Sequence, residues 1–208
     1  MNSVHLRRYS DLTALIYLLS ERKITLSNPA SWDDTNDSYY LALYREKKSL
    51  KSVLALCFTQ AQETYHHWRV FAPGSDGVCI RFTRKDLLNA VQGRSGLHQK
   101  SVTYLKLGKI RGGSLAVEDL PFLKRFAFAH ESEFRMIYES KTAREPKLDI
   151  PIPLSSIDRI TLSPWLHPAL FPHVKKTLLS INGCSGLDIR RSTLIGNEEW
   201  KTLGEDSS

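Results

Sequence analysis

Short apolar segments separated by turn-forming residues constrain the fold of this 208-residue chain more than any other feature. Runs such as Val53–Thr59, Val78–Phe82 and Ile157–Leu162 have the length and composition of buried strands. We expect about eight such strands, with helices scattered among them and no regular strand–helix–strand spacing. The pattern predicts an α+β fold, in which a single domain contains a curved, largely antiparallel sheet.

The other expected elements follow from apolar periodicity and turn signals. Further strands are predicted at Val4–Tyr9, Ile24–Ser27, Ser101–Leu107, Glu133–Ser140, Leu148–Ile152 and Leu187–Ser192. Helices are predicted after a Ser10 cap and at Tyr39–Lys51, Gln60–Phe71, Leu87–Val91, Leu120–Phe128 and Leu170–Ile181. The acidic, turn-rich stretch from Asn28 to Asp37 is predicted to be a loop, and a loop this long and polar is often functional.

The chain is expected to form one domain over residues 1–203, followed by a polar tail at 204–208. No internal repeat and no Gly/Ser-rich or Pro-rich linker divides it. No apolar run approaches the roughly 20 residues of a membrane helix, and the first residues do not form a secretory signal. Without such a signal, a cytoplasmic location is expected, and because the three cysteines are odd in number and far apart, we expect no disulfide and no zinc.

The charge balance points to a polyanionic partner. The chain has 29 basic and 22 acidic residues, a net charge of +7 and a pI of about 9.3. Such a balance fits nucleic acid, but it equally fits a merely well-solvated surface. Because the basic residues occur as dispersed pairs, the sequence does not show that they share one face, and both interpretations stay open.

The densest candidate site is the segment Phe128–Arg135, at an expected helix-to-strand junction. Side chains alternate across a strand, so Glu131, Glu133 and Arg135 would share one face. Two neighbouring carboxylates raise the pKa of one of them unless a cation intervenes, and such pairs serve acid and base chemistry. The alternative is a solvated strand face on which Arg135 pairs with one glutamate.

Two further elements lie elsewhere in the chain. Arg7 and Arg8 are expected at the end of the first strand, where a guanidinium can bind phosphate through two hydrogen bonds. Thr59 is expected at the end of a buried strand, where its hydroxyl either serves a site or caps the next helix. A metal site at His66 and His67 is disfavoured, because adjacent helical side chains point about 100° apart.

Taken in order, several of these segments resemble a bacterial family known as domain of unknown function 2971. The resemblance rests on Leu6–Tyr9, Ser27–Thr35, Cys57–Thr59, His67–Ala72, Gly77–Phe82, Val102–Tyr104 and Phe128–Arg135. It covers the chain from Leu6 to about Ile160. The family name implies no activity. However, a basic residue on the first strand, a hydroxyl after a central strand and an E-x-E glutamate resemble the layout of mono-ADP-ribosyltransferases.

That resemblance implies NAD as co-substrate and a role for each candidate residue. Glu133 would stabilise the cation that forms as nicotinamide leaves, and Glu131 would orient the incoming nucleophile. Arg8 or Arg7 would neutralise the pyrophosphate, and Thr59 would support the ribose or position the glutamate. Tyr9 or Tyr40 would stack on the nicotinamide ring, although each also suits an apolar core.

The leading hypothesis is therefore an NAD-dependent mono-ADP-ribosyltransferase of the bacterial toxin or phage-defence kind, with nucleic acid as acceptor and RNA among the candidates. Such an enzyme would harm its host, so a neutralising antitoxin protein is expected. Two alternatives stay open. One is a non-catalytic nucleic-acid-binding or regulatory module, and the other is a metal-dependent nuclease that uses Asp33, Asp34, Asp37 and Glu131.

Overall fold

The computed structural model describes residues 3–111 and 113–205. Packing divides the chain into two compact units, each assembled from separate stretches of sequence. Unit 1 comprises the chain up to Leu6 together with Lys23–Ala61 and Arg84–Ile152, and unit 2 comprises Arg7–Arg22, Gln62–Thr83 and the chain from Pro153 onward. The single domain expected over residues 1–203 stays a prediction, and three residues of its expected tail, 206–208, lie outside the described residues.

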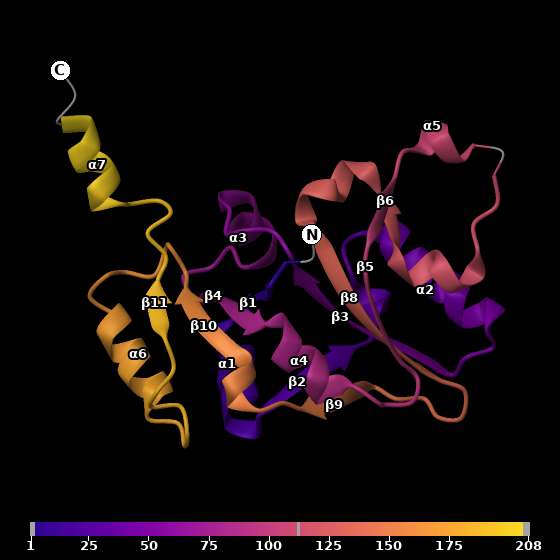
Figure 1. Cartoon of the computed structure of the whole chain (residues 1–208), viewed down its shortest axis with the longest axis horizontal. Helices are drawn as coiled ribbons and strands as arrows, with labels where there is room; N and C mark the ends of the chain where they lie inside the picture. The colour runs from indigo at the N-terminus through magenta and orange to yellow at the C-terminus, as the bar shows by residue number, and fades with distance from the viewer. Residues whose placement is uncertain (1–2, 112, 206–208) are drawn as a thin grey trace. The chain divides into compact units, whose positions relative to one another are not determined.

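Unit 1 is built on antiparallel strands in the order β9-β2-β3-β8-β5. Its strands are β2 (Lys23–Ser27), β3 (Ser52–Thr59), β5 (Leu97–Ser101), β6 (Thr103–Leu105), β7 (Leu123–Arg125), β8 (Glu133–Ser140) and β9 (Lys147–Pro151). Its helices are α2 (Thr35–Lys47), α4 (Arg84–Val91) and α5 (Leu107–Ile110), with short 3₁₀ turns η1 (Pro29–Ser31), η2 (Val117–Phe122) and η3 (Phe126–Glu131). β6 and β7 pair in parallel as a separate two-stranded sheet, and the chain forms α5 and η2 between them (Figure 1).

The core of unit 1 lies between α2 and the paired strands β3 and β8. Leu41 and Tyr44 of α2 pack with Val53 and Ala55 of β3 and with Ile137 of β8. Asp34 begins α2 because its side chain accepts hydrogen bonds from the main-chain N–H groups of Asn36 and Asp37. The packing fixes α2 against the sheet, and α2 also contacts η2 and β7.

Unit 2 contains β1 (His5–Asp11, from Arg7 onward), β4 (Gly77–Thr83), β10 (Ile157–Leu162) and β11 (Ile189–Arg191) in the order β1-β4-β10-β11. Its other elements are α1 (Leu12–Glu21), α3 (Tyr65–Phe71), η4 (Leu154–Ser156), α6 (Phe171–Leu179) and α7 (Glu198–Glu205). β4 and β10 are antiparallel, and β10 and β11 are parallel. The predicted α+β class with a largely antiparallel sheet is confirmed. No helix in the described part of the chain has the length and apolar character that crossing a membrane would require.

Several predicted boundaries are wrong for local physical reasons. The first strand continues to Asp11, and Asp11 rather than Ser10 caps α1, with its carboxylate 2.7 Å from the Ala14 nitrogen. The helix expected at 120–128 is instead two 3₁₀ turns flanking β7, because Pro121 cannot donate the hydrogen bond of a helix interior. The acidic loop is shorter than expected, because the Asp34 cap begins α2 at Thr35.

Candidate functional site

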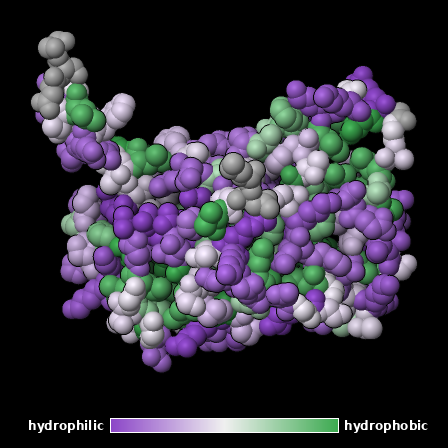
Figure 2. Space-filling view, viewed as in Figure 1, coloured by the Kyte–Doolittle hydropathy of each residue, from purple (hydrophilic) through white to green (hydrophobic). Residues whose placement is uncertain are grey.

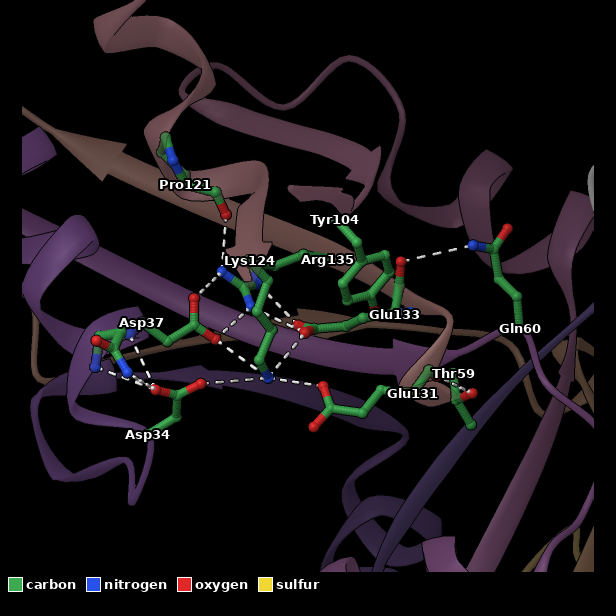
Figure 3. Close-up of polar contacts among 11 residues, drawn as sticks. Asp34, Asp37, Thr59, Gln60, Tyr104, Pro121, Lys124, Glu131, Glu133 and Arg135 are labelled. Atoms are coloured by element: carbon green, nitrogen blue, oxygen red, sulfur yellow. Dashed lines mark hydrogen bonds and ion pairs between the residues drawn. The ribbon is translucent and has the colours of Figure 1, made fainter. Parts of the chain in front are cut away.

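Six charged side chains of unit 1 form one connected cluster, called here the ion network (Figure 3). Its members come from the start of α2, from β7, from the end of η3 and from β8. They are Asp34, Asp37, Lys124, Glu131, Glu133 and Arg135. Burying so many charges is unfavourable unless they are paired, so the pairing geometry determines what the cluster can do.

Arg135 is fully buried, and all five of its N–H groups are used. Its Nε and one terminal nitrogen donate to the two carboxylate oxygens of Glu133, at 2.7 and 2.9 Å. Both terminal nitrogens donate to Asp37, at 2.9 and 2.7 Å, and one also donates to the Pro121 carbonyl at 2.8 Å. The alternative of a solvated strand face is therefore wrong, because Arg135 joins two carboxylates inside the protein.

The register of β3 and β8 explains this position. Thr59 lies opposite Glu133, and Cys57 lies opposite Arg135. Because strand side chains alternate between faces, Glu133 and Arg135 project to the same side, as the sequence predicted. The β8 bounds, Glu133–Ser140, also agree with the prediction.

The Lys124 ammonium lies within 4 Å of all four carboxylates of the network. Its Nζ lies 2.6 Å from a Glu131 oxygen, 3.4 Å from Asp37 and 3.6 Å from Glu133. It is also 3.9 Å from Asp34. Burial alone would lower the pKa of Lys124, but the surrounding carboxylates raise it above its ordinary value. With all groups ionised, four carboxylates face two cations, so the network carries an excess of negative charge.

Glu131 is not on the strand, where the sequence placed it. It ends η3, and Ser132 adopts a left-handed conformation with φ 46° before β8 begins. The Thr59 hydroxyl donates to the Glu131 carbonyl at 2.5 Å and accepts from the Ala61 N–H at 3.0 Å. Tyr104 accepts from the Glu133 N–H at 2.7 Å. The two glutamates meet at Lys124 because of this turn, rather than through strand alternation.

The two glutamates have opposite electrostatic environments. Burial would raise the pKa of Glu133, but its hydrogen bonds with Arg135 and the nearby Lys124 outweigh burial and lower it below the usual value of 4.5. Burial raises the pKa of Glu131 above that value, and the neighbouring Glu133 adds to this against the attraction of Lys124. Environments that push two neighbouring pKa values apart assign different protonation tasks to the two groups.

This difference predicts opposite effects of Glu131→Gln and Glu133→Gln on stability. The ionised Glu133 contributes stability above the ordinary glutamate pKa, and this contribution is lost as pH falls through its folded value. The ionised Glu131 costs stability above its raised pKa, and this cost disappears as pH falls toward 4.5. At pH 7 we therefore expect Glu133→Gln to lower the free energy of unfolding and Glu131→Gln to maintain or raise it.

The free energy of unfolding of both variants and of the wild type is measured by urea unfolding between pH 4 and pH 8. Glu139→Gln is the matched control on the same strand, because Glu139 pairs with the Tyr44 hydroxyl and His98 away from the network. The difference between Glu131→Gln and the wild type should shrink as pH falls toward 4.5, whereas the difference for Glu133→Gln should begin to shrink only near the lower end of this pH range, because the folded pKa of Glu133 lies below 4.5. Equal destabilisation by Glu131→Gln and Glu133→Gln at pH 7 would contradict the assignment.

A pocket of about 380 Å³ borders the ion network in unit 1. One wall is the first turns of α2, with Asp34, Asp37 and Tyr40, and the opposite wall comes from β6, α5 and β7, with Lys124 and Arg125. Its size falls in the usual range for small-molecule sites, and its lining combines acidic, basic and aromatic groups. Tyr40, which the sequence analysis named as a candidate site residue, therefore lines this pocket. Lys124 lines it too, and its ammonium contacts both Glu131 and Glu133.

The other predicted residues belong to unit 2. Arg7 lies in the middle of β1, rather than at its end, and is buried with a nitrogen 2.7 Å from the Gln62 side-chain oxygen. Arg8 follows it in the same strand and is half-buried. Tyr9 packs in a core, stacked on His67 and edge-on to Trp68. The predicted convergence of Arg8, Thr59 and Glu133 on one dinucleotide stays a prediction, while Thr59 and Glu133 do lie opposite each other.

The proposed nuclease residues lie in a different arrangement from a metal site. Among residues 3–111 and 113–205, no three His, Cys, Asp or Glu side chains are grouped to hold a metal ion. Asp34, Asp37 and Glu131 instead surround the Lys124 ammonium, and Asp33 is exposed. An ammonium at the centre of the carboxylates takes the place that a divalent cation would need.

Sequence reasoning missed Lys124 and the central place of Asp37. Lys124 was visible only as one of several basic pairs, and its burial results from the two 3₁₀ turns that flank β7. Asp37 had a local signal, since it follows the helix-capping Asp34 by three residues and so falls in the first helical turn. Its pairing with Arg135, 98 residues away, had none.

Similarity to known proteins is found among solved structures. No family model matches the chain, so membership of the domain of unknown function 2971 family is not confirmed, and no curated protein matches it. Among solved structures, the chain is similar to DarT of Thermus sp. 2.9 in complex with ADP-ribosylated ssDNA, with a TM-score of 0.48 and 8% identity over 92% of this chain and 95% of that one. It is similarly related to the same protein in complex with NAD+, with a TM-score of 0.47 and 10% identity over 92% and 96%. At these values the likeness carries no argument about activity.

Proposed function

We propose that this chain is an NAD-dependent mono-ADP-ribosyltransferase of the toxin or phage-defence kind that modifies nucleic acid. The observation that carries the proposal is the E-x-E pair, which lies behind the pocket lining and contacts its Lys124. Glu133 is held ionised by Arg135, Glu131 has a raised pKa, and both contact Lys124, which lines the pocket. A carboxyl with a lowered pKa next to one with a raised pKa suits the two steps of the transfer.

The lining of the pocket fits the charges of NAD. A dinucleotide has a cationic nicotinamide ring and an anionic pyrophosphate, so its site needs negative and positive groups within one cavity. Asp34 and Asp37 supply negative charge on one wall, and Arg125 supplies positive charge on the other. Tyr40 offers a ring for stacking.

The first step needs electrostatic stabilisation. As the bond between the ribose carbon and the nicotinamide nitrogen breaks, its electron pair leaves with nicotinamide and positive charge develops on the ribose. The ion network has an excess of carboxylates, and Arg135 fixes the Glu133 carboxylate in advance, so no reorganisation is needed when that charge appears. Arg135 and Lys124 act as positioning residues for the two glutamates.

The second step needs a proton acceptor. A nitrogen or oxygen of the nucleic acid forms the new bond to the ribose carbon and gives up a proton. Glu131 is the better candidate to take that proton, because a carboxylate with a raised pKa binds a proton more strongly than one with a lowered pKa, such as Glu133. Thr59 positions the main chain at Glu131, because its hydroxyl donates a hydrogen bond to the Glu131 carbonyl.

The purified protein incubated with NAD tests this function. Reactions contain single-stranded DNA, duplex DNA, RNA or no acceptor, and are scored for released nicotinamide and for label transferred from NAD labelled in its adenylate part. We expect transfer to at least one nucleic acid and the same rate with a metal chelator present. Wild-type protein that releases no nicotinamide and labels none of these acceptors would overturn the proposal.

A non-catalytic nucleic-acid-binding module is the second candidate. The observation that favours it is that Arg135 binds both carboxylate oxygens of Glu133, so a purely structural ion network accounts for the same contacts. This candidate predicts oligonucleotide binding with no consumption of NAD. It also predicts that Glu133→Gln changes stability alone.

A further inference from the structure

The excess positive charge of the chain is concentrated in one unit. Unit 1 has 18 basic and 12 acidic residues, which accounts for +6 of the total of +7. Its buried ion network contains more carboxylates than cations, so the basic surplus of unit 1 lies outside that network. A polyanion would therefore be attracted to the surface of unit 1.

The segment from β6 to α5 brings part of this surplus to the pocket. Lys106, Lys109 and Arg111 are exposed, and the sequence from 101 to 117 contains no acidic residue. Leu105, Leu107 and Ile110 alternate with them and line the pocket. In the described part of the chain, none of the three basic side chains forms an ion pair with a carboxylate. We call these three residues, together with Phe126, the pocket rim.

The pocket rim also carries exposed apolar surface. Phe126 is 48% exposed, and the Lys106 ammonium lies 4.4 Å from the centre of its ring. Leu107 is 51% exposed in the same region. Figure 2 shows hydrophilic residues over the α5 segment, at the upper right, beside green apolar ones. Proteins that bind single-stranded nucleic acid use basic side chains to contact the phosphates and exposed aromatic rings to stack on the unpaired bases.

We propose that the pocket rim binds single-stranded nucleic acid and delivers it to the pocket. Lys106, Lys109 and Arg111 contact successive phosphates, and the Phe126 ring stacks on an unpaired base. A single strand is favoured over a duplex because an exposed ring can stack only on a base whose face is open. This inference deepens the proposed function, since it names the acceptor class for the same pocket, but the binding itself requires no NAD.

The test is binding of a fluorescent single-stranded oligonucleotide, measured by anisotropy without NAD over a series of salt concentrations. The rim variant combines Lys106→Glu, Lys109→Glu and Arg111→Glu. The control variant combines Lys47→Glu, Lys141→Glu and Arg144→Glu, which are exposed residues of unit 1 outside the pocket lining and give the same change in charge. A further variant, Phe126→Ala, removes the ring without a change in charge.

We expect the rim variant to weaken binding by tenfold or more. The slope of log affinity against log salt should fall by about 2, because each phosphate that the protein neutralises on a single strand contributes about 0.7. Phe126→Ala should weaken single-strand binding by about tenfold, because base–aromatic stacking contributes about 1–3 kcal/mol. The control variant should weaken binding less than the rim variant does. A duplex of the same sequence should bind more weakly to the wild type.

Equally weakened binding in the rim and control variants, or tighter binding of the duplex, would overturn the inference. A second measurement, the release of nicotinamide from NAD with water in place of a nucleic-acid acceptor, separates failure of this inference from failure of the proposed function. A rim variant that still releases nicotinamide but neither binds nor labels the oligonucleotide supports both proposals. Wild-type protein that releases no nicotinamide and labels no acceptor, but binds single strands through the rim, overturns the proposed function and leaves this inference intact.

Discussion

Replacing Arg135 by alanine is expected to lower the free energy of unfolding by about 3–5 kcal/mol. The substitution removes the cation that pairs with Asp37 and Glu133, and it leaves two carboxylates buried with only Lys124 nearby. It also removes the donor to the Pro121 carbonyl. Urea unfolding at pH 7, with the slope against urea concentration checked for constancy, measures the decrease.

Arg144→Ala is the matched control for this experiment. Arg144 is exposed in the same unit, so its replacement should change the free energy of unfolding by less than about 0.5 kcal/mol. A decrease below about 1 kcal/mol in Arg135→Ala would mean that water or local rearrangement solvates the two carboxylates, in contradiction to the buried pairing described above.

Glu133→Gln is expected to reduce the rate of ADP-ribosyl transfer by about 10²–10³-fold, the usual cost of removing one fixed electrostatic contact to a transition state. The substitution keeps the size of the side chain but removes the negative charge that the Arg135 guanidinium holds in place. We expect kcat to fall while KM changes little, because the interaction strengthens only as positive charge develops on the ribose. Steady-state nicotinamide release, at a temperature where the variant is folded, measures the change.

Glu139→Gln separates catalysis from stability. Glu139 lies on β8 with Glu133 and is also hydrogen-bonded, to the Tyr44 hydroxyl at 2.6 Å, but it belongs to neither the ion network nor the pocket lining. We expect it to lower stability and to preserve kcat. If Glu139→Gln and Glu133→Gln reduce turnover equally, the effect of Glu133 is structural and the second candidate function gains support.

The strands were the most predictable part of the fold. Glu133–Ser140 and Ile157–Leu162 agree with β8 and β10 because each is a short run of strand-forming residues between turn signals. The alternation within β8 also predicted correctly that Glu133 and Arg135 share a face. The segment between 117 and 131 was not predictable, since Pro121 and the left-handed Ser132 replace an apparently helical apolar pattern with 3₁₀ turns.

The sequence by itself determined the α+β class, the strand that carries Glu133 and Arg135 on one face, and the positive net charge, because strand periodicity and charge balance are local or additive properties. Only the tertiary structure decided that Arg135 binds Asp37, that Lys124 gathers both glutamates, and that a pocket opens beside them. Those contacts join residues up to 98 positions apart. Their existence depends on strand register, which residue type and spacing do not encode, and on two short turns, of which the one at Pro121 had a signal in residue type and the one that ends at Glu131 had none.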